Sequence, residues 1–490
     1  MTLRCRAGHL PSLAAEAVQW RTLRFAAHDQ VAEIEVPVLD DAQMSALARH
    51  VRASARRILQ ALSVDTIVRI VDRAVMRLLD RADPLRRELD ELLPIVTGYD
   101  PEMVRLGLDA GLQTFRAPQL HRFLAQDFPN PKVLDGFHPS VNGGMVRAYG
   151  PRLLVHSWAG NVPGLPLWSL ACGLLVKAGN IGKLPSAEPV FASLFARLLT
   201  EVHPPLGDCL AMVWWQGGAS DIGRTLYREA DTVLAYGGNA ALAEVRDQVP
   251  VTTRFLGFGH KLGVALVGRP ALDRQRGPAI ARLIAQDLVR HEQQGCYSPH
   301  GVYVERDGAI SPRMFAQHVA AELASLARRH PRRVLALEES VEVAGWRQAA
   351  EWQATAAGGN FELLADDDST WAVAFSAEPQ PLSASPGQRC VRICGVDALD
   401  DVARLLEPHA DFLQTVGVAT APDELYRLAS LLGQIGVTRI AAIGAMTLPE
   451  AGWHHDGRSN LADLVRMVDI EPAAERAADR LASYAQEHRP

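Results

Sequence analysis

Apolar residues recur at helical spacing in the segment that follows Ser63. Isoleucine, valine and leucine occupy one face of this pattern, and arginine and aspartate lie between them. This spacing predicts an amphipathic helix with Ser63 as its N-cap, because a serine hydroxyl can accept a hydrogen bond from a free backbone N–H. Residues 1–100 are therefore predicted to form a largely helical accessory region. The apolar positions of the helix are Ile67, Ile70, Val71, Val75, Leu78 and Leu79.

Between residues 150 and 268 the pattern changes to short apolar runs that alternate with helical stretches. Strands that are apolar on both faces are typical of a parallel sheet covered by helices, an architecture that binds nucleotides at its carboxyl edge. Residues 101–268 are therefore predicted to form a Rossmann-type cofactor-binding domain. The predicted strands are 153–156, 210–215, 232–236 and 262–267, and the predicted helices are about 165–178, 189–203, 219–229 and 239–248.

A second α/β unit is predicted for residues 269–455. A helical apolar face that includes Ile284 and Leu288 runs into Gly295 and Cys296, and a strand follows at 302–305. A glycine pair, an acidic run and a Pro/Ser segment indicate surface loops inside this unit. Residues 456–490 form a C-terminal return segment. The predicted fold class is α/β, with two α/β domains after a helical region. The loops are expected at 358–359, 366–368 and 379–386.

Charge and cysteine usage narrow the class of protein. The 490 residues carry 50 basic and 56 acidic side chains, a net charge of −6, and no basic block, so neither nucleic acid nor an anionic membrane is an expected partner. The six cysteines form no C-x-x-C pair and show no zinc-ligand spacing, which predicts reduced thiols and no metal. Met1 is not followed by the apolar run of a secretory signal, and a cytoplasmic location is expected.

The uncharged segment 153–176 is long enough to span a bilayer. Gly160, Pro163 and Pro166 would interrupt a helix there and expose backbone groups that lipid cannot satisfy. A buried strand, a tight loop and a buried helix are predicted instead of a membrane span.

Cys296 is the first candidate for chemistry. It follows Gly295 at a predicted helix-to-strand junction, which exposes the side chain and its backbone N–H, although a lone cysteine is more often a small buried apolar residue. Asn161 follows a predicted strand end, where an amide can donate to an oxyanion beside a cysteine nucleophile. An asparagine flanked by glycine and proline also simply forms a turn, so this pattern alone leaves both roles open.

Candidate cofactor residues lie in the same region. Lys183, one of only four lysines, can contact a ribose or phosphate, and its alternative is an ordinary solvated cation. Gly237 and Gly238 open a predicted helix, where backbone N–H groups can approach a pyrophosphate, but no G-x-G-x-x-G motif accompanies them. His291 and His300 flank Cys296 and receive no role, because a histidine on a helix face is more often packed in the core.

Taken in order, these motifs resemble the aldehyde dehydrogenase superfamily and, more closely, its LuxC-type acyl-CoA reductase family, over about residues 145–472. The resemblance implies an aldehyde dehydrogenase-like fold. The motifs are His156-Ser-Trp-Ala-Gly-Asn-Val-Pro-Gly164, Gly179-Asn-Ile-Gly-Lys183, Ala235-Tyr-Gly-Gly238, Gly257-Phe-Gly-His-Lys261, Gln293-Gln-Gly-Cys-Tyr-Ser-Pro299, Leu413-Gln-Thr-Val-Gly417, His455-Asp-Gly-Arg458 and Leu464-Val-Arg466.

The resemblance implies that Cys296 is the nucleophile and that Asn161, with the Cys296 backbone N–H, holds the oxyanion. Lys183 would contact the adenosine ribose or its phosphate, and the other residues at the cofactor would be Ser186, Gly237, Gly238 and Gly257. The cysteine would take the acyl group from a thioester, and hydride transfer to this acyl-enzyme would release an aldehyde.

Two departures from the superfamily pattern refine this expectation. Gly257 occupies the position of the glutamate that activates hydrolytic water, so acyl reduction is favoured over oxidation of an aldehyde to an acid. Ser186 replaces an acidic residue that would repel a ribose phosphate, which makes NADPH the expected cofactor, with NADH as the alternative. Glu188, close by in sequence, leaves the choice between the two open.

The predicted function is therefore NADPH-dependent reduction of an acyl thioester, a fatty acyl-CoA or an acyl-protein, to its aldehyde. The alternatives are an aldehyde dehydrogenase that forms the acid, an acyl-phosphate reductase of the same superfamily, and a non-catalytic partner subunit. The resemblance also implies an acyl-activating or acyl-carrier protein as partner and a homo-oligomer formed near residues 146–149 and through the C-terminal segment.

Overall fold

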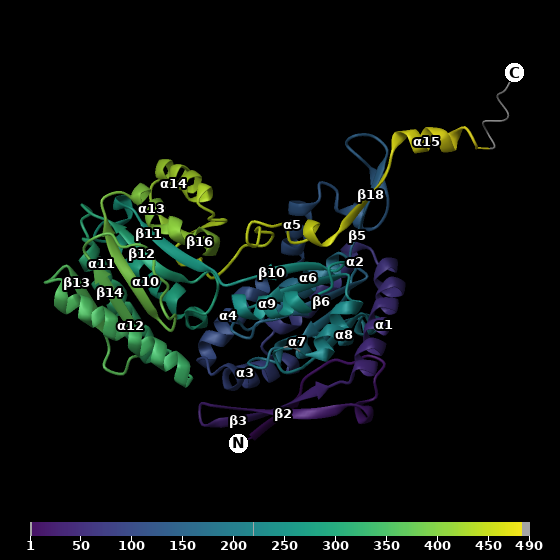
Figure 1. Cartoon of the computed structure of the whole chain (residues 1–490), viewed down its shortest axis with the longest axis horizontal. Helices are drawn as coiled ribbons and strands as arrows, with labels where there is room; N and C mark the ends of the chain where they lie inside the picture. Colours follow the sequence, from purple (N-terminus) through teal and green to yellow (C-terminus); the bar gives the residue numbers. More distant parts are fainter. Residues whose placement is uncertain (1, 219, 483–490) are drawn as a thin grey trace.

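The computed structural model describes residues 2–218 and 220–482, which form two lobes side by side (Figure 1). The first lobe surrounds a five-stranded sheet and the second a seven-stranded sheet. After the second lobe the chain runs back to the first, where Leu461 and Leu464 are buried. The division proposed between residues 455 and 456 falls within this return.

The N-terminal region is a correction to the sequence-based prediction. Residues 2–38 form a three-stranded sheet, and only the part after it is helical. Ala32, Ile34 and Val36 are buried at every second position and join the core of the first lobe, so this region is part of that lobe. Its elements are β1 (Thr2–Arg6), β2 (Gln19–Ala27), β3 (Gln30–Val38), α1 (Asp41–Ile58), α2 (Val64–Leu79) and α3 (Pro84–Thr97). Ser63 caps α2 as expected, through its hydroxyl oxygen, which accepts from the Thr66 N–H.

The five-stranded sheet is wholly parallel, in the order β10-β9-β6-β7-β8. The chain leaves β6 in one direction and later returns to pair β9 on its other side, so the crevice above β6 and β9 is a topological switch point, where such sheets bind ligands. The strands are β6 (Leu153–Ser157), β7 (Gly179–Lys183), β8 (Leu210–Val213), β9 (Thr232–Tyr236) and β10 (Arg254–Phe258). The helices are α6 (Leu165–Leu175), α7 (Phe191–Val202), α8 (Asp221–Glu229) and α9 (Asn239–Gln248).

The segment 153–176 forms β6, a loop and α6, as predicted. Among the described residues, none of the helices combines the length and apolar character that crossing a bilayer requires. Two further helices, α4 (Pro101–Gln113) and α5 (Ala117–Asp127), complete the first lobe, and α4 packs against the segment that precedes Cys296.

The seven-stranded sheet has the order β13-β14-β15-β12-β11-β16-β17 and is parallel except for β13. β11 lies in this sheet, so the chain changes lobe at residues 259–261, and the predicted boundary after residue 268 is wrong by one strand. The strands are β11 (Leu262–Val267), β12 (Pro299–Glu305), β13 (Phe361–Ala365), β14 (Ala372–Ser376), β15 (Cys390–Val396), β16 (Leu413–Ala419) and β17 (Arg439–Ala442). The longer helices are α10 (Arg276–Val289), α11 (Pro312–Arg329), α12 (Leu337–Ala356) and α14 (Pro422–Gln434).

A small antiparallel sheet extends from the first lobe (Figure 1). It joins β18 (Arg466–Ile470) to β5 (Met145–Tyr149), and α15 (Pro472–Asp479) follows it. Met467 and Val468 on β18 are 47 % and 37 % exposed. Pairing of two copies through this sheet stays a prediction.

Candidate active site

Two cavities meet at Cys296. The polar cleft, about 870 Å³, lies between the lobes and is lined by Gly237, Gly238 and Lys261 on one side and by residues 293–297 and 385–387 on the other. The apolar cavity, about 120 Å³, lies between α4, α6 and residues 447–453. Both are lined by Cys296, Tyr297, Val162, Leu165 and His455. A group held on the thiol is therefore accessible from two different environments.

The backbone before Cys296 adopts an uncommon conformation. α10 ends at Val289, and His291, Glu292 and Gln293 then have φ of 53°, 51° and 63°. Each non-glycine residue in this left-handed region costs about 1–2 kcal/mol, so the segment needs strong tertiary support. The segment reverses the chain between α10 and β12 and leaves Cys296 facing both cavities.

The support comes from residues 385–390. Arg389 donates to both carboxylate oxygens of Glu292, at 2.6 and 2.7 Å, and both side chains are buried. The Gln388 N–H donates to the Glu292 carbonyl at 3.1 Å, and the Gln293 side chain donates to the Pro299 and Cys390 carbonyls. We call this set, Glu292 and Gln293 with Gln388 and Arg389, the loop clamp. It joins the segment that precedes Cys296 to a loop that lines the polar cleft.

The thiol of Cys296 has one polar side-chain partner among the described hydrogen bonds. Gln414 Nε2 lies 3.5 Å from its Sγ and also donates to Asp456 Oδ1 at 2.6 Å. Burial raises the pKa of the Cys296 thiol to about 11; the Gln414 hydrogen bond lowers it, the Asp456 carboxylate raises it and the Arg439 charge lowers it. The thiol is therefore protonated at neutral pH in the resting protein.

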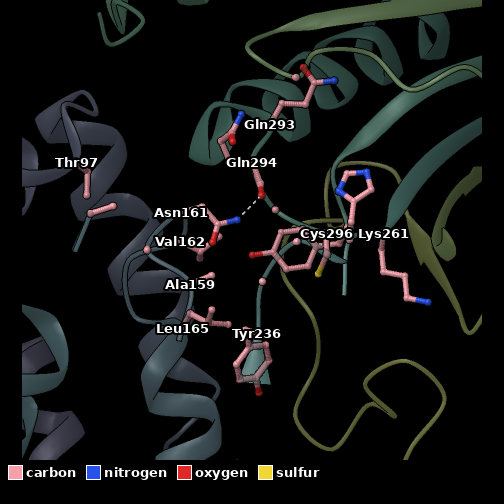
Figure 2. Close-up of a pocket in the computed structure, with 18 of the residues that line it drawn as sticks. Thr97, Ala159, Asn161, Val162, Leu165, Tyr236, Lys261, Gln293, Gln294 and Cys296 are labelled. Carbon is pink, nitrogen blue, oxygen red and sulfur yellow. Dashed lines mark hydrogen bonds between the residues drawn. The ribbon is translucent and has the colours of Figure 1, made fainter. Parts of the chain in front are cut away.

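Asn161 reaches the nucleophile segment from the loop after β6 (Figure 2). The Asn161 side-chain Nδ2 donates to the Gln294 backbone carbonyl at 2.6 Å, and the Asn161 backbone carbonyl accepts from the Tyr99 hydroxyl at 2.7 Å. Its Oδ1 is buried with no partner among the described residues. The structure thus brings the predicted amide to the predicted nucleophile segment, with one amide hydrogen bonded and a second one available.

The predicted cofactor residues divide into two sets. Gly237 and Gly238 line the polar cleft at the start of α9, and a Cβ added at Gly238 would meet nothing within 4 Å. The described residues that line the cleft do not include Lys183, Ser186 or Gly257. Gly257 lies within β10, where a Cβ would approach the Phe255 ring at 3.0 Å, while its neighbours Phe258 and Gly259 reach the cleft.

Lys183 and Ser186 lie at the carboxyl end of β7, beside the cleft residue Ala187. The Lys183 ammonium is over the Trp215 ring, 5.5 Å from its centroid, and burial lowers its pKa. Ser186 is exposed, and its hydroxyl accepts from the Trp214 indole at 3.1 Å.

Glu188, the acidic residue that left the choice of cofactor open in the sequence, lies just before α7. Its carboxylate is buried, and Oε1 accepts from the N–H groups of Val190 and Phe191, both at 2.8 Å. It therefore binds the amino end of α7 and is held away from solvent. Burial raises the pKa of this carboxyl to about 7.

The histidines around Cys296 are packed side chains. His300 shares a hydrogen bond with the Ser385 hydroxyl at 3.0 Å, and His455 stacks on Phe258 with ring centroids 4.4 Å apart. Burial lowers the pKa of His291, His300 and His455 to about 4 in each case, so all three are neutral at pH 7.

Several residues of the site received no role from the sequence. Gln414 and Asp456 were present in two of the motifs of the resemblance, and this was the only local signal. The Glu292–Arg389 pair carried no sequence signal, because it joins residues that are 97 positions apart. The glycines of α4 carried none either, because the space around a missing side chain is known only from the folded structure.

Comparison with known proteins shows which family the chain belongs to. A sequence profile described as acyl-CoA reductase (LuxC) matches residues 59–467. Two relatives are each named long-chain acyl-protein thioester reductase. The protein from Vibrio harveyi is 22 % identical over 470 residues, 94 % of this chain and 93 % of its own. That from Aliivibrio fischeri is 25 % identical over 391 residues, 79 % and 78 % of the two chains.

Solved structures agree on the fold. An aldehyde dehydrogenase from Physcomitrella patens, solved with its product succinate, superposes with a TM-score of 0.73 at 12 % identity, covering 96 % of this chain and 98 % of its own. An NADP-dependent glyceraldehyde-3-phosphate dehydrogenase from Bacillus halodurans, solved with NADP, has a TM-score of 0.68 at 14 % identity, covering 92 % and 96 %. The predicted aldehyde dehydrogenase-like α/β fold is confirmed.

Proposed function

The chain belongs to the acyl-CoA reductase (LuxC) family and reduces an acyl thioester to the aldehyde, and from this premise we propose that NADPH is the hydride donor and that Cys296 carries the acyl group as a thioester. The observation that carries the proposal is the meeting of a polar cleft and an apolar cavity at one thiol. A reductase of this kind must present one carbonyl carbon to a polar dinucleotide and hold a hydrocarbon tail apart from it.

The chain's own residues suit a dinucleotide in the polar cleft. The backbone at Gly237 and Gly238 is uncovered, so a pyrophosphate can approach the amino end of α9. Lys183 supplies a cation at the end of β7, and Ser186 and the buried Glu188 present no exposed carboxylate there, which favours a ribose that carries a phosphate. A bound nicotinamide supplies hydride to the carbonyl carbon.

The first half-reaction transfers the acyl group. The Cys296 thiolate attacks the thioester carbonyl, the oxyanion accepts from the Cys296 N–H and the free Asn161 amide hydrogen, and the C–S bond to the leaving thiol breaks. The proton of Cys296 leaves with that thiol, so charge is balanced.

The second half-reaction releases the product. Hydride addition to the acyl-enzyme gives a hemithioacetal oxyanion held by the same two donors, and its collapse breaks the C–S bond and frees the aldehyde. The net change is acyl thioester plus NADPH plus one proton to aldehyde, thiol and NADP⁺. The carboxylates among the described residues that line the cleft are Glu339 and Glu342, both on α12, and position 257 carries no base to activate water.

The apolar cavity suits the hydrocarbon tail. Its described lining includes no Asp, Glu, Lys or Arg, and its two histidines are neutral at pH 7. The relatives are named for acyl-protein thioesters, so an acyl-carrier or acyl-activating protein is the proposed physiological donor, and acyl-CoA is the practical substrate.

The test is an intact-mass measurement with acyl-CoA and no NADPH. We expect one acyl adduct on the wild-type chain, none on Cys296→Ala, and release of aldehyde when NADPH is added. An unchanged adduct in Cys296→Ala contradicts the nucleophile assignment. Oxidation of aldehyde to acid with NADP⁺, or reduction of an acyl phosphate in preference to acyl-CoA, would instead support one of the two alternative activities.

The cofactor is tested separately by steady-state kinetics with NADPH and NADH. A lower KM for NADPH is expected, and Ser186→Glu should raise that KM while leaving the KM for NADH nearly unchanged. An equal rise in the KM values for NADPH and NADH would contradict the role given to Ser186. The proposed homo-oligomer is checked by the mass of the native protein.

A further inference from the structure

Helix α4 carries two glycines one turn apart. Gly107 and Gly111 are four positions apart in the sequence, so they lie on the same face of the helix. Both line the apolar cavity that Cys296 also lines. A glycine inside a helix costs about 0.5–1 kcal/mol relative to alanine. These two positions on α4 therefore have a structural or functional reason to lack side chains.

The two glycines have different surroundings. A Cβ at Gly107 would come 3.2 Å from His291 Cε1, so this glycine allows α4 to pack on the segment before Cys296. A Cβ at Gly111 would meet nothing within 4 Å. Packing of the chain on itself explains Gly107 and does not explain Gly111.

Gly111 is itself exposed and lies at the open edge of the apolar cavity, where the neighbouring lining residues are apolar. Leu112 and Phe115 flank it on α4 and the turn after it, and Trp168 and Phe191 of α6 and α7 line the same cavity. Phe115 and Trp168 meet edge to face with ring centroids 5.7 Å apart. The Trp168 indole N–H is bonded to Asn460 Oδ1 at 2.9 Å, so this side chain offers the cavity an apolar ring.

We propose that Gly111 is a specificity-determining residue: the acyl chain carried on Cys296 runs along α4 past Gly107, and the missing side chain at position 111 makes room for its distal methylenes. This inference rests on the proposed function, in which Cys296 holds the acyl group. The ligand class is an acyl group with an uncharged hydrocarbon tail, because the described lining is apolar and offers no charged partner to a substituent.

The test compares Gly111→Ala and Gly111→Leu with the wild type over acyl-CoA substrates from butanoyl to hexadecanoyl. For Gly111→Leu we expect kcat/KM on hexadecanoyl-CoA to fall about ten- to fiftyfold, because each methylene excluded from an apolar site weakens binding about fourfold. Activity on butanoyl-CoA should stay within about twofold, and Gly111→Ala should fall between wild type and Gly111→Leu.

Two controls separate packing from specificity. Gly345 lies in the interior of α12, also with nothing within 4 Å of an added Cβ, and Gly345→Leu should leave the chain-length profile unchanged. Gly107→Ala should lower activity on all chain lengths alike, because it displaces His291. Thermal unfolding of each variant shows that it is folded.

The outcomes distinguish the inference from the proposed function. If the wild type forms no adduct with any acyl-CoA, the proposed function fails. If the wild type forms adducts and Gly111→Leu keeps the wild-type profile, or loses all chain lengths equally, the role of Gly111 is wrong and the proposed function stands.

Discussion

At the scale of single residues, Cys296 is a thiol whose reactivity depends on two neighbours. Gln414 donates a hydrogen bond toward its Sγ and also binds Asp456, so one amide links the nucleophile to a carboxylate. The two act in opposite directions, since the Gln414 bond lowers the pKa of the thiol and the Asp456 charge raises it. Burial has the largest effect and raises the pKa of the thiol to about 11, so the resting thiol is protonated at neutral pH and reacts slowly with oxidants and electrophiles.

A pair of substitutions tests this arrangement. Gln414→Ala should move the pH dependence of Cys296 alkylation by iodoacetamide to higher pH, and Asp456→Asn should move it to lower pH, because each removes one of the two opposing effects. The alkylation rate is measured from pH 6 to 10 by intact mass. Shifts in the same direction for both variants would contradict the proposed link.

At the scale of elements, the loop clamp holds three left-handed residues in front of the nucleophile. The Glu292–Arg389 pair is buried, and removing one member leaves the other charge without a partner. Removing one partner of such a pair costs about 3–5 kcal/mol, whereas replacing both with apolar side chains is often neutral.

This asymmetry gives a second prediction. Glu292→Gln should lower the free energy of unfolding by about 3–5 kcal/mol and slow acylation of Cys296. The double variant Glu292→Leu with Arg389→Met should recover most of the stability while acylation stays slow, since no bidentate contact then joins the two loops. Urea unfolding and single-turnover acylation are the two measurements. Recovery of both in the double variant would show that the pair only stabilises the fold.

The start of α7 gives a third prediction, which concerns pH. The pKa of Glu188 is raised from its ordinary 4.5 to about 7, so the folded state keeps a proton that the unfolded state loses. The contribution of Glu188 to the free energy of unfolding of the wild type therefore falls as pH rises from about 4.5 to 7.

Glu188→Gln keeps an oxygen that can accept the two N–H bonds but does not titrate. The stability of this variant relative to wild type should therefore be about 2–3 kcal/mol more favourable at pH 8 than at pH 5. Urea unfolding at both pH values checks it, and a difference that does not change with pH would contradict the raised pKa.

At the scale of the whole molecule, the proposed mechanism assigns the two lobes to different halves of one reaction. The first lobe offers the glycine turn at the start of α9 and the α4 face, and the second lobe offers Cys296 and its clamp. Among the described residues, the polar cleft and the apolar cavity share only Val162, Leu165, Cys296, Tyr297 and His455, so a change at the far end of the cleft should spare acylation.

Gly238→Val tests this separation. A side chain there meets nothing in the folded chain but projects where a pyrophosphate would approach, so the KM for NADPH should rise about tenfold or more. The rate of adduct formation on Cys296 without NADPH should stay unchanged. Gly217→Val is the matched control, since Gly217 also has open space around it and does not line the cleft among its described residues. An equal loss of acylation in Gly238→Val would show that the halves are not separable.

Much of the first lobe follows from local pattern. The strands β6, β8 and β9 were predicted because short runs of consecutive apolar residues are typical of strands buried between two layers of helices. β7 was not predicted, because two glycines and a lysine in Gly179–Lys183 hide its apolar character. The sheet at residues 2–38 was missed although β3 alternates, and β11 was assigned to the wrong sheet, because strand pairing is decided by distant partners.

The sequence by itself determined the α/β class and the ordered motifs, since each motif depends on residues close together in the chain, and the resemblance that these motifs carry predicted Cys296 as the nucleophile and Asn161 as an oxyanion donor. Only the tertiary structure decided that Asn161 contacts the segment before Cys296, that Gln414 links Asp456 to the thiol, that Arg389 supports Glu292, and that Gly111 lies at the exposed edge of an apolar cavity. Contacts between segments about a hundred residues apart, and space that no side chain fills, are properties of packing and leave no periodic trace in the sequence.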